Sequence, residues 1–231
     1  MIQSKIVIEG SITAAQMKEF WRQVSESTIT GPAFQKFLEH EYFWNGAFPN
    51  LNWRKTYHSL GLDQQYAGFL ASNPLPFVDG YWNIPALKGV TCNKVVETFR
   101  ELGVNVQTCC GDLDANTPVN DRDPDNGSYW ISCKATVEAD EELKNLSAND
   151  LKEQAVSGIT LPERLLLELA YFVTTGAHLD VENWTLCSGS RYLDGDVPRM
   201  CWGSDAREFR VDWFYPGYGY DGLRARAAVS L

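Results

Sequence analysis

Basic residues are few in this chain. Its 20 Lys and Arg stand against 30 Asp and Glu, which gives a formal net charge of −10. Nonspecific binding to nucleic acids or anionic membranes needs clustered Lys and Arg. The closing segment RARAAVSL holds two arginines, too few for a basic patch. The charge pattern therefore predicts neither a nucleic-acid partner nor a membrane partner.

Long apolar runs are also missing. No run approaches the ~20 residues of a membrane span, and the segment MIQSKIVIEG lacks the sustained apolar region and cleavage site of a signal peptide. We therefore expect a cytoplasmic location by default. With 231 residues and 44% hydrophobic residues, the chain can form one large domain, or one domain with a substantial extension.

Metal-ligand patterns are scarce. The three histidines, His40, His58 and His178, stand far apart, without the spacing of a metal site. Residues 120–127 (NDRDPDNG) resemble a calcium loop only superficially. Counting from Asp121, loop positions six and twelve hold Asn and Ser, where an EF-hand needs Gly and Glu. The sequence therefore predicts no metal and no cofactor.

Cysteine motifs are absent as well. The six cysteines include no CxxC pair and no regular framework, which in a domain of this size favours reduced and mostly buried thiols. They are Cys92, Cys109, Cys110, Cys133, Cys187 and Cys201.

The first third of the chain reads as mostly helical. A short strand is expected at residues 4–9, and helices are expected from Thr13 and after Pro32. Residues 43–53 are aromatic and turn-rich, which predicts irregular structure, and a third short helix is expected around 66–70. The sequence Asn-Pro-Leu-Pro that follows predicts a boundary between a helical region at 1–75 and a domain at 76–231.

The second region mixes strands and helices. Strands are expected at 77–85 and 128–139, with a helix capped by Thr91 between them. The strongest helix is Leu161–Thr175, where Thr160 and Glu163 form a capping box and Gly176 stands at the C-terminal cap. This pattern predicts an α+β fold.

The chain is richest in aromatics near its end. Between Trp202 and Gly222 seven aromatic residues alternate with glycine, serine and aspartate, a composition typical of binding surfaces. Strand alternation predicts Trp202, Val211 and Trp213 as core residues. Phe214, Tyr215, Tyr218 and Tyr220 run through Gly and Pro, which predicts an exposed loop.

Several linked segments carry a family resemblance. The chain resembles variable proteins of diversity-generating retroelements, which have a C-type lectin fold similar to that of formylglycine-generating enzymes. The likeness covers roughly the last two thirds of the chain. It rests on DGYWNIP, NDRDPDNGSYW, LPERLLLELAYFVTTGAHLDVENW, CSGSRYLDGDVP, CWGSD, VDW and GLRARAAVSL.

The resemblance implies a C-type lectin-like domain that binds a ligand through a diversified surface, with no catalysis. In such systems adenines of a template are mutagenised, and the variable segment here would span about 190–222. The partner would be an unknown protein or other macromolecule, and a homo-oligomer is possible. The implied surface residues are Arg199, Cys201, Gly203, Ser204, Asp205, Arg210, Asp212, Phe214, Tyr215, Gly217, Tyr218, Gly219, Tyr220 and Asp221.

Two alternatives stay open. One is an oxidase similar to formylglycine-generating enzyme, in which Cys187 and Cys201 would form a low-pKa redox pair with bound copper. The other is a structural protein of a phage particle, which overlaps the binding hypothesis.

Overall fold

The computed structural model describes residues 18, 22, 51–76, 78 and 80–230. The segment Leu51–Leu231 forms one compact unit. The strand expected at residues 4–9, the helix expected after Pro32 and His40 lie outside the described residues. Of the helix expected from Thr13, only Lys18 and Arg22 are described, and both are helical. In the part of the chain that is described, no helix is long and apolar enough to cross a membrane.

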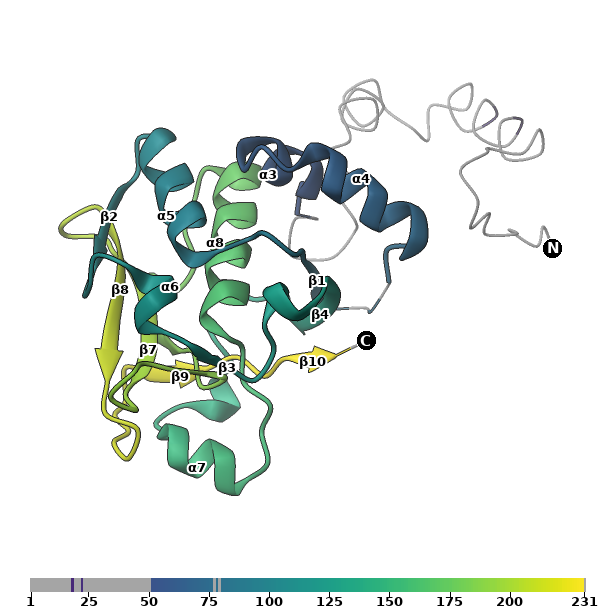
Figure 1. Ribbon diagram of the computed structural model, residues 1–231. Helices are drawn as coiled ribbons and strands as arrows, with labels where there is room; N and C mark the ends of the chain where they lie inside the picture. Colours follow the sequence, from purple (N-terminus) through teal and green to yellow (C-terminus); the bar gives the residue numbers. More distant parts are fainter. Residues whose placement is uncertain (1–17, 19–21, 23–50, 77, 79, 231) are drawn as a thin grey trace. The chain divides into compact units, whose positions relative to one another are not determined.

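Helix α8 (Leu161–Thr175) runs through the middle of this unit, with β-strands on either side of it (Figure 1). The backbone N–H of Glu163 donates to the Thr160 hydroxyl, and the N–H of Thr160 donates to the Glu163 carboxylate, so the capping box is formed. Gly176 ends the helix in the left-handed conformation, with φ of 73°. The prediction of this helix is confirmed at both ends.

The larger sheet has five strands: β2 (Asn105–Thr108), β5 (Trp184–Leu186), β7 (Val197–Gly203), β8 (Glu208–Phe214) and β9 (Leu223–Ala225). Their order is β2-β8-β7-β5-β9. β7 is antiparallel to both β8 and β5, whereas β2 and β9 pair in parallel with β8 and β5. Met200, Phe209 and Val211 turn toward α8 in the main core and are at most 2% exposed.

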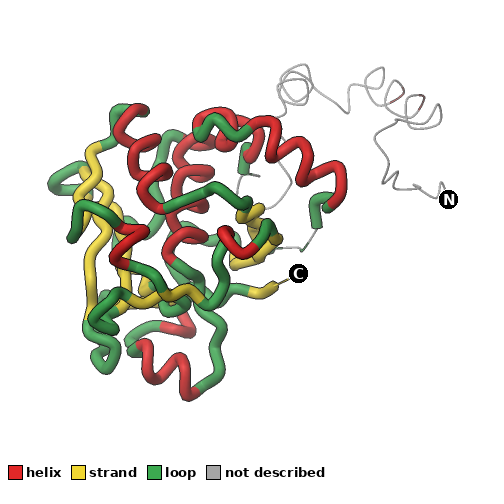
Figure 2. The backbone as a smooth tube through the Cα atoms, viewed as in Figure 1, coloured by secondary structure: helices red, strands yellow, loops and turns green. Residues whose placement is uncertain are grey.

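The other described strands form two smaller sheets (Figure 2). β1 (Tyr81–Ala86), β4 (Tyr129–Lys134) and β10 (Val229–Ser230) form one, and β3 (Val119–Asn120) pairs with β6 (Ser190–Arg191). The expected strands at 77–85 and 128–139 therefore appear as β1 and β4. The remaining helical segments are α3 (Trp53–Ser59), α4 (Asp63–Ser72), α5 (Cys92–Glu101), α6 (Leu113–Asn116), α7 (Ala148–Glu153), η1 (Pro124–Asn126) and η2 (Glu141–Leu143).

Helices α3 and α4 belong to the compact unit. The backbone N–H of Asn52 donates to the Thr174 hydroxyl at 2.8 Å, so the start of α3 is joined to the end of α8. Trp53 and Tyr57 are buried in the main core. The compact unit therefore begins at Leu51 and not after the Pro-rich boundary expected at residues 75 and 76, because the aromatic face of α3 packs on α8.

A charged network that sequence patterns do not indicate lies inside the core. Asp180 accepts hydrogen bonds from Arg164 at 3.0 and 2.6 Å and from Arg226 at 2.9 Å, and all three side chains are 0% exposed. Burial by itself raises the pKa of Asp180, but the guanidinium groups of Arg226 and Arg164 outweigh it and hold this pKa below its usual value. The Asp180 carboxylate also accepts from the Thr185 hydroxyl on β5.

This network connects the larger sheet to α8 through hydrogen bonds. The backbone N–H of Trp202, on β7, donates to the Asp180 carbonyl at 3.0 Å. Arg164 also donates to Glu168 at 2.9 Å, and Glu168 in turn lies 2.9 Å from Nδ1 of His178. The imidazole of His178 stacks on the Trp202 ring, with ring centroids 3.5 Å apart. His178 thus has a structural role in joining α8 to the sheet.

The observed class is α+β, as predicted. Helices and strands from both halves of the described chain share one main core, and the larger sheet is completed by strands from near the chain end.

Candidate binding surface on the β7–β8 hairpin

The strand register gathers the expected surface residues on one face. Side chains of residues paired across antiparallel strands lie on the same side of the sheet, and successive residues alternate between sides. Because Met200 and Val211 are paired and face α8, their neighbours face away from it. We call this second side the outer face. Its pairs are Val197 with Phe214, Arg199 with Asp212, Cys201 with Arg210, and Gly203 with Glu208.

Arg199 is the most constrained side chain on the outer face. Its guanidinium carbon lies 4.3 Å from the centre of the Trp184 ring and 4.5 Å from that of Phe214. The same group donates to the Asp212 carboxylate at 2.8 Å and to the Tyr220 hydroxyl at 3.2 Å. Cation–π contacts and an ion pair in one group fix the position of this charge.

Small residues on β7 make room for Arg210. Nε of Arg210 donates to Glu208 at 2.7 Å. A Cβ atom at Gly203 would lie 2.8 Å from the guanidinium carbon of Arg210, so glycine allows this side chain to rest over β7. Cys201 and Gly203 share the outer face, but both are buried, Cys201 to 6% exposure. Their assignment to the exposed surface is wrong, because larger neighbours cover them.

A cavity of about 240 Å³ opens beside these residues. Continuing the pairing of β5 with β7 places Trp184 opposite Cys201, which is paired with Arg210. The cavity is lined by Gln107, Thr108, Cys109, Trp184, Arg210, Val211 and Asp212. Sequence reasoning missed β2 as a contributor, because its parallel pairing with β8 joins segments about 100 residues apart.

The loop after β8 carries exposed tyrosines. Tyr215 is 64% exposed and Tyr218 is 60% exposed, as expected for this loop. Phe214 and Tyr220 are half-buried instead, with ring centroids 5.4 Å apart, and they pack on a second apolar cluster. That cluster consists of Leu143, Ala148, Leu151, Leu186, Val197, Leu223 and Ala225.

Helix α7 holds this loop in place. The backbone N–H of Asn149 donates to the Pro216 carbonyl at 3.0 Å. A Cβ atom at Gly219 would lie 2.3 Å from the Asn145 carbonyl oxygen, so only glycine fits this position without a backbone shift. The assignment of Gly219 to the variable surface is therefore wrong, because the structure requires glycine there.

Trp213 is exposed, although strand alternation predicts it as core. It shares a face with Val211, as predicted, but its side chain is 55% exposed whereas Val211 is 2% exposed. The core beneath β8 ends between these two residues, where Trp213 pairs with Pro198. Trp202, also expected in the core, is partly buried and packs against it. Trp213 is therefore exposed on the side of β8 opposite to the outer face.

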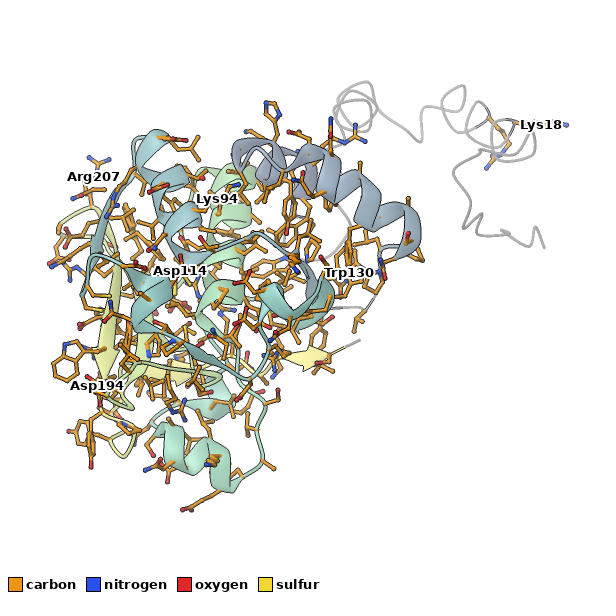
Figure 3. The ribbon with its side chains drawn as sticks, viewed as in Figure 1. Lys18, Lys94, Asp114, Trp130, Asp194 and Arg207 are labelled. Carbon is orange, nitrogen blue, oxygen red and sulfur yellow. The ribbon has the colours of Figure 1, made fainter. Side chains whose placement is uncertain are left out.

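The turn between β7 and β8 contributes at the other end of the hairpin. Ser204 and Asp205 are exposed there. Figure 3 labels Arg207 in this turn and Asp194 near the opposite end of the two strands. Of the remaining expected surface residues, Gly217 and Asp221 are exposed, and Arg199, Arg210 and Asp212 are half-buried.

The cysteines form no disulfide in this structure. All six are free, as expected, and four of them are buried. Burial raises the pKa of Cys187, and it raises the pKa of Cys201 to about 12. Within the described residues, no group of three or more His, Cys, Asp or Glu side chains is placed to hold a metal ion.

Comparison of the chain with protein-family models, with curated proteins and with solved structures finds no match. The functional argument therefore rests on the geometry of the surface.

Proposed function

We propose that this chain is a ligand-binding protein of the C-type lectin kind, with a surface diversified by a retroelement on β7, β8 and the loop that follows. The observation that carries the proposal is the separation of two residue sets on the same hairpin. Residues expected to vary lie on the outer face and in the adjoining loop and turn, whereas Met200, Phe209 and Val211 lie in the core. Such an arrangement allows the surface to change while the core keeps the fold.

The chemistry of the surface favours a macromolecular ligand. Tyr215 and Tyr218 in the loop after β8 are each more than half exposed, and large aromatic side chains are enriched among the residues that dominate the binding energy of protein interfaces. Arg199 and Arg210 are each paired with a carboxylate, so the strands present both signs of charge. This mixture suits recognition of a protein surface through aromatic contacts and hydrogen bonds.

The oxidase alternative has less support. A redox pair needs accessible thiols with a lowered pKa. Cys187 and Cys201 are buried, and burial shifts the pKa of both in the opposite direction. No observation on the outer face calls for covalent chemistry, so recognition is the function that we propose.

Two combinatorial libraries test the proposal. A surface library randomises Ser204, Asp205, Tyr215 and Tyr218, and a matched core library randomises Met200, Phe209, Val211 and Leu223. Most surface variants should stay folded, since exposed substitutions usually change stability by less than ~0.5 kcal/mol. Most core variants should unfold. Protease resistance of displayed variants, read by sequencing, measures the folded fraction of each library.

The surface library should also yield binders when it is selected on immobilised serum albumin. Binders that retain protease resistance would support a surface built for recognition. Equal loss of folding in the two libraries would contradict the separation of core and surface. A folded surface library that yields no binder would contradict the binding function.

A further inference from the structure

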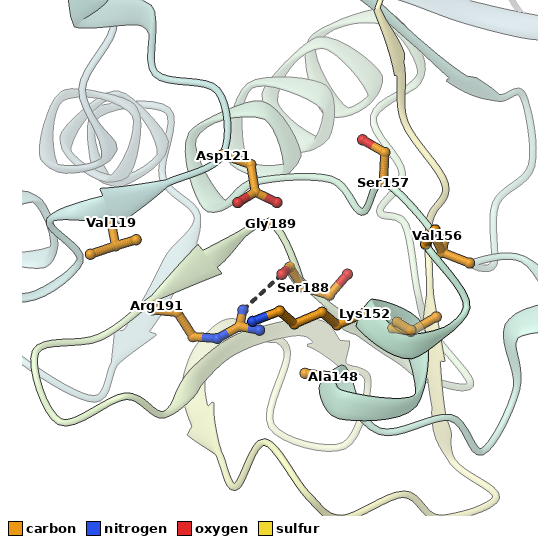
Figure 4. Close-up of a pocket in the computed structure, with 11 residues that line it drawn as sticks. Val119, Asp121, Ala148, Lys152, Val156, Ser157, Ser188, Gly189 and Arg191 are labelled. Atoms are coloured by element: carbon orange, nitrogen blue, oxygen red, sulfur yellow. Dashed lines mark hydrogen bonds between the residues drawn. The ribbon is translucent and has the colours of Figure 1, made fainter.

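A second cavity, of about 470 Å³, lies away from the hairpin surface, and no lining residue is shared with the smaller cavity. It is bounded by α7, β3, β6 and the chain segments at 155–157 and 188–189 (Figure 4). Its lining includes the apolar residues Leu151 and Val156. It also includes polar residues, namely Asp121, Lys152, Ser157, Ser188 and Arg191. Its volume is within the range of ~300–1,000 Å³ that is common for small-molecule sites.

Two cations converge in this cavity. In Figure 4 the ends of the Lys152 and Arg191 side chains point toward one another. Nη1 of Arg191 donates to the backbone carbonyls of Ser188 and Ser190, each at 2.7 Å, which fixes the guanidinium. Among the described residues, no carboxylate lies within ion-pair distance of Arg191, although Asp121 acts on its charge from farther away, and Lys152 has no hydrogen-bond or ion-pair partner. Like charges repel, and more strongly beside walls that exclude water, so an anion between them would be stabilising.

Two further observations concern the polar residues of the lining. Burial lowers the pKa of Arg191, although the Asp121 carboxylate acts on it in the opposite direction. The hydroxyl oxygen of Ser188 is buried and has no hydrogen-bond partner within the described chain. It packs against Gly158, so the two cations, and not this hydroxyl, carry the argument for an anion. Asp121 also lines the cavity and supplies a hydrogen-bond acceptor.

We propose that this cavity binds a small organic molecule with an oxyanion group, either a carboxylate or a phosphate monoester. The oxyanion would lie between Lys152 and Arg191, and the apolar part of the molecule would contact Leu151 and Val156. The net charge of −10 makes nonspecific attraction of anions unfavourable, so binding would depend on these local cations. This site is independent of the hairpin surface and of the function proposed for it.

Titration calorimetry of the full chain with phenylacetate, phenyl phosphate, inorganic phosphate and benzyl alcohol tests the proposal. At least one of the first two should bind at millimolar concentrations and should bind more weakly as salt is raised. Benzyl alcohol, which lacks the charge, should not bind. Tighter binding of phenylacetate would identify the oxyanion as a carboxylate, and tighter binding of phenyl phosphate would identify it as a phosphate. Inorganic phosphate should bind more weakly than phenyl phosphate, because it makes no apolar contact.

Lys152→Gln should weaken binding by about tenfold, as expected for loss of one charge-assisted hydrogen bond. Lys152 is exposed, so this change should leave folding intact. Lys144→Gln is the matched control, because Lys144 is also exposed, lies near α7 and does not line the cavity, and it should bind as the unaltered chain does. Absence of binding by both phenyl anions would overturn the proposal. Equal affinities of the Lys152→Gln and Lys144→Gln variants would overturn it as well.

Discussion

Replacement of Asp180 by asparagine is expected to lower the free energy of unfolding by about 3–5 kcal/mol, the usual cost of breaking a buried ion pair from one side. The change keeps the shape of the side chain but removes the charge that pairs with Arg164 and Arg226, both 0% exposed. The two guanidinium groups would then remain buried, and Glu168 would be the one carboxylate left in this network to balance their charge. Urea denaturation followed by tryptophan fluorescence measures the difference.

Asp205→Asn is the matched control. Asp205 is exposed in the turn between β7 and β8, so the same chemical change there should alter stability by less than ~0.5 kcal/mol. A similar small effect at Asp180 would contradict the role given to the buried network. A large effect at Asp205 would contradict the description of the turn as a free surface.

The same network predicts how stability depends on pH. The pKa of Asp180 is lower in the folded protein than in the unfolded chain, where it is ~3.9. Its contribution is therefore complete above about pH 4 to 5 and is lost as pH falls through the folded-state pKa. The stability of the unaltered protein should fall in this acid range, whereas the Asp180→Asn variant should lose this part of the dependence.

Phe209→Ala is expected to destabilise the protein by about 3–5 kcal/mol, because it removes a buried ring and leaves a cavity. Phe209 is 0% exposed, and its ring lies 5.3 Å from that of Phe99 on α5. Trp213→Ala should change stability by only ~0.5 kcal/mol, because Trp213 is 55% exposed. The two aromatics lie on the same strand and the same side of it, four residues apart, so each is a control for the other.

Denaturant melts of both variants compare the two positions. Large destabilisation by both would mean that Trp213 is packed against other residues. Small effects from both would mean that β8 does not cover the main core. The expected contrast locates the edge of the core between Val211 and Trp213.

Sequence patterns predicted best the structural features that depend only on neighbouring residues. The capping box of Thr160 and Glu163, the glycine at the end of α8 and the cap of Thr91 on α5 are local signals, and all appear in the structure. Alternation along β8 placed Val211 and Trp213 on one face, as predicted, because that depends on the strand alone. Phe214, expected in the loop, is the last residue of the strand.

Distant contacts were beyond such patterns. Asp180 meets Arg164 and Arg226, which are 16 and 46 residues away, and nothing in the neighbouring sequence indicates either pairing. The exposure of Trp213 depends on where the core ends, and the need for glycine at 219 depends on the carbonyl of Asn145. The smaller cavity needs β2 beside β8. These features follow from tertiary packing, which periodicity and composition do not specify.

The central claim is that the outer face and its loop are diversified while the scaffold is kept. Sequencing the genomic region around the gene tests it most directly, by comparing the segment that encodes residues 190–222 with a near-copy that serves as template. The account predicts a neighbouring reverse transcriptase gene, and differences only at template adenines, in codons such as those of Ser204, Asp205, Asp212, Tyr215, Tyr218 and Tyr220. The codons of Val211, Gly219 and Leu223 should match the template. Lack of a near-copy, or differences spread evenly over both sets of codons or over bases other than adenine, would contradict the claim.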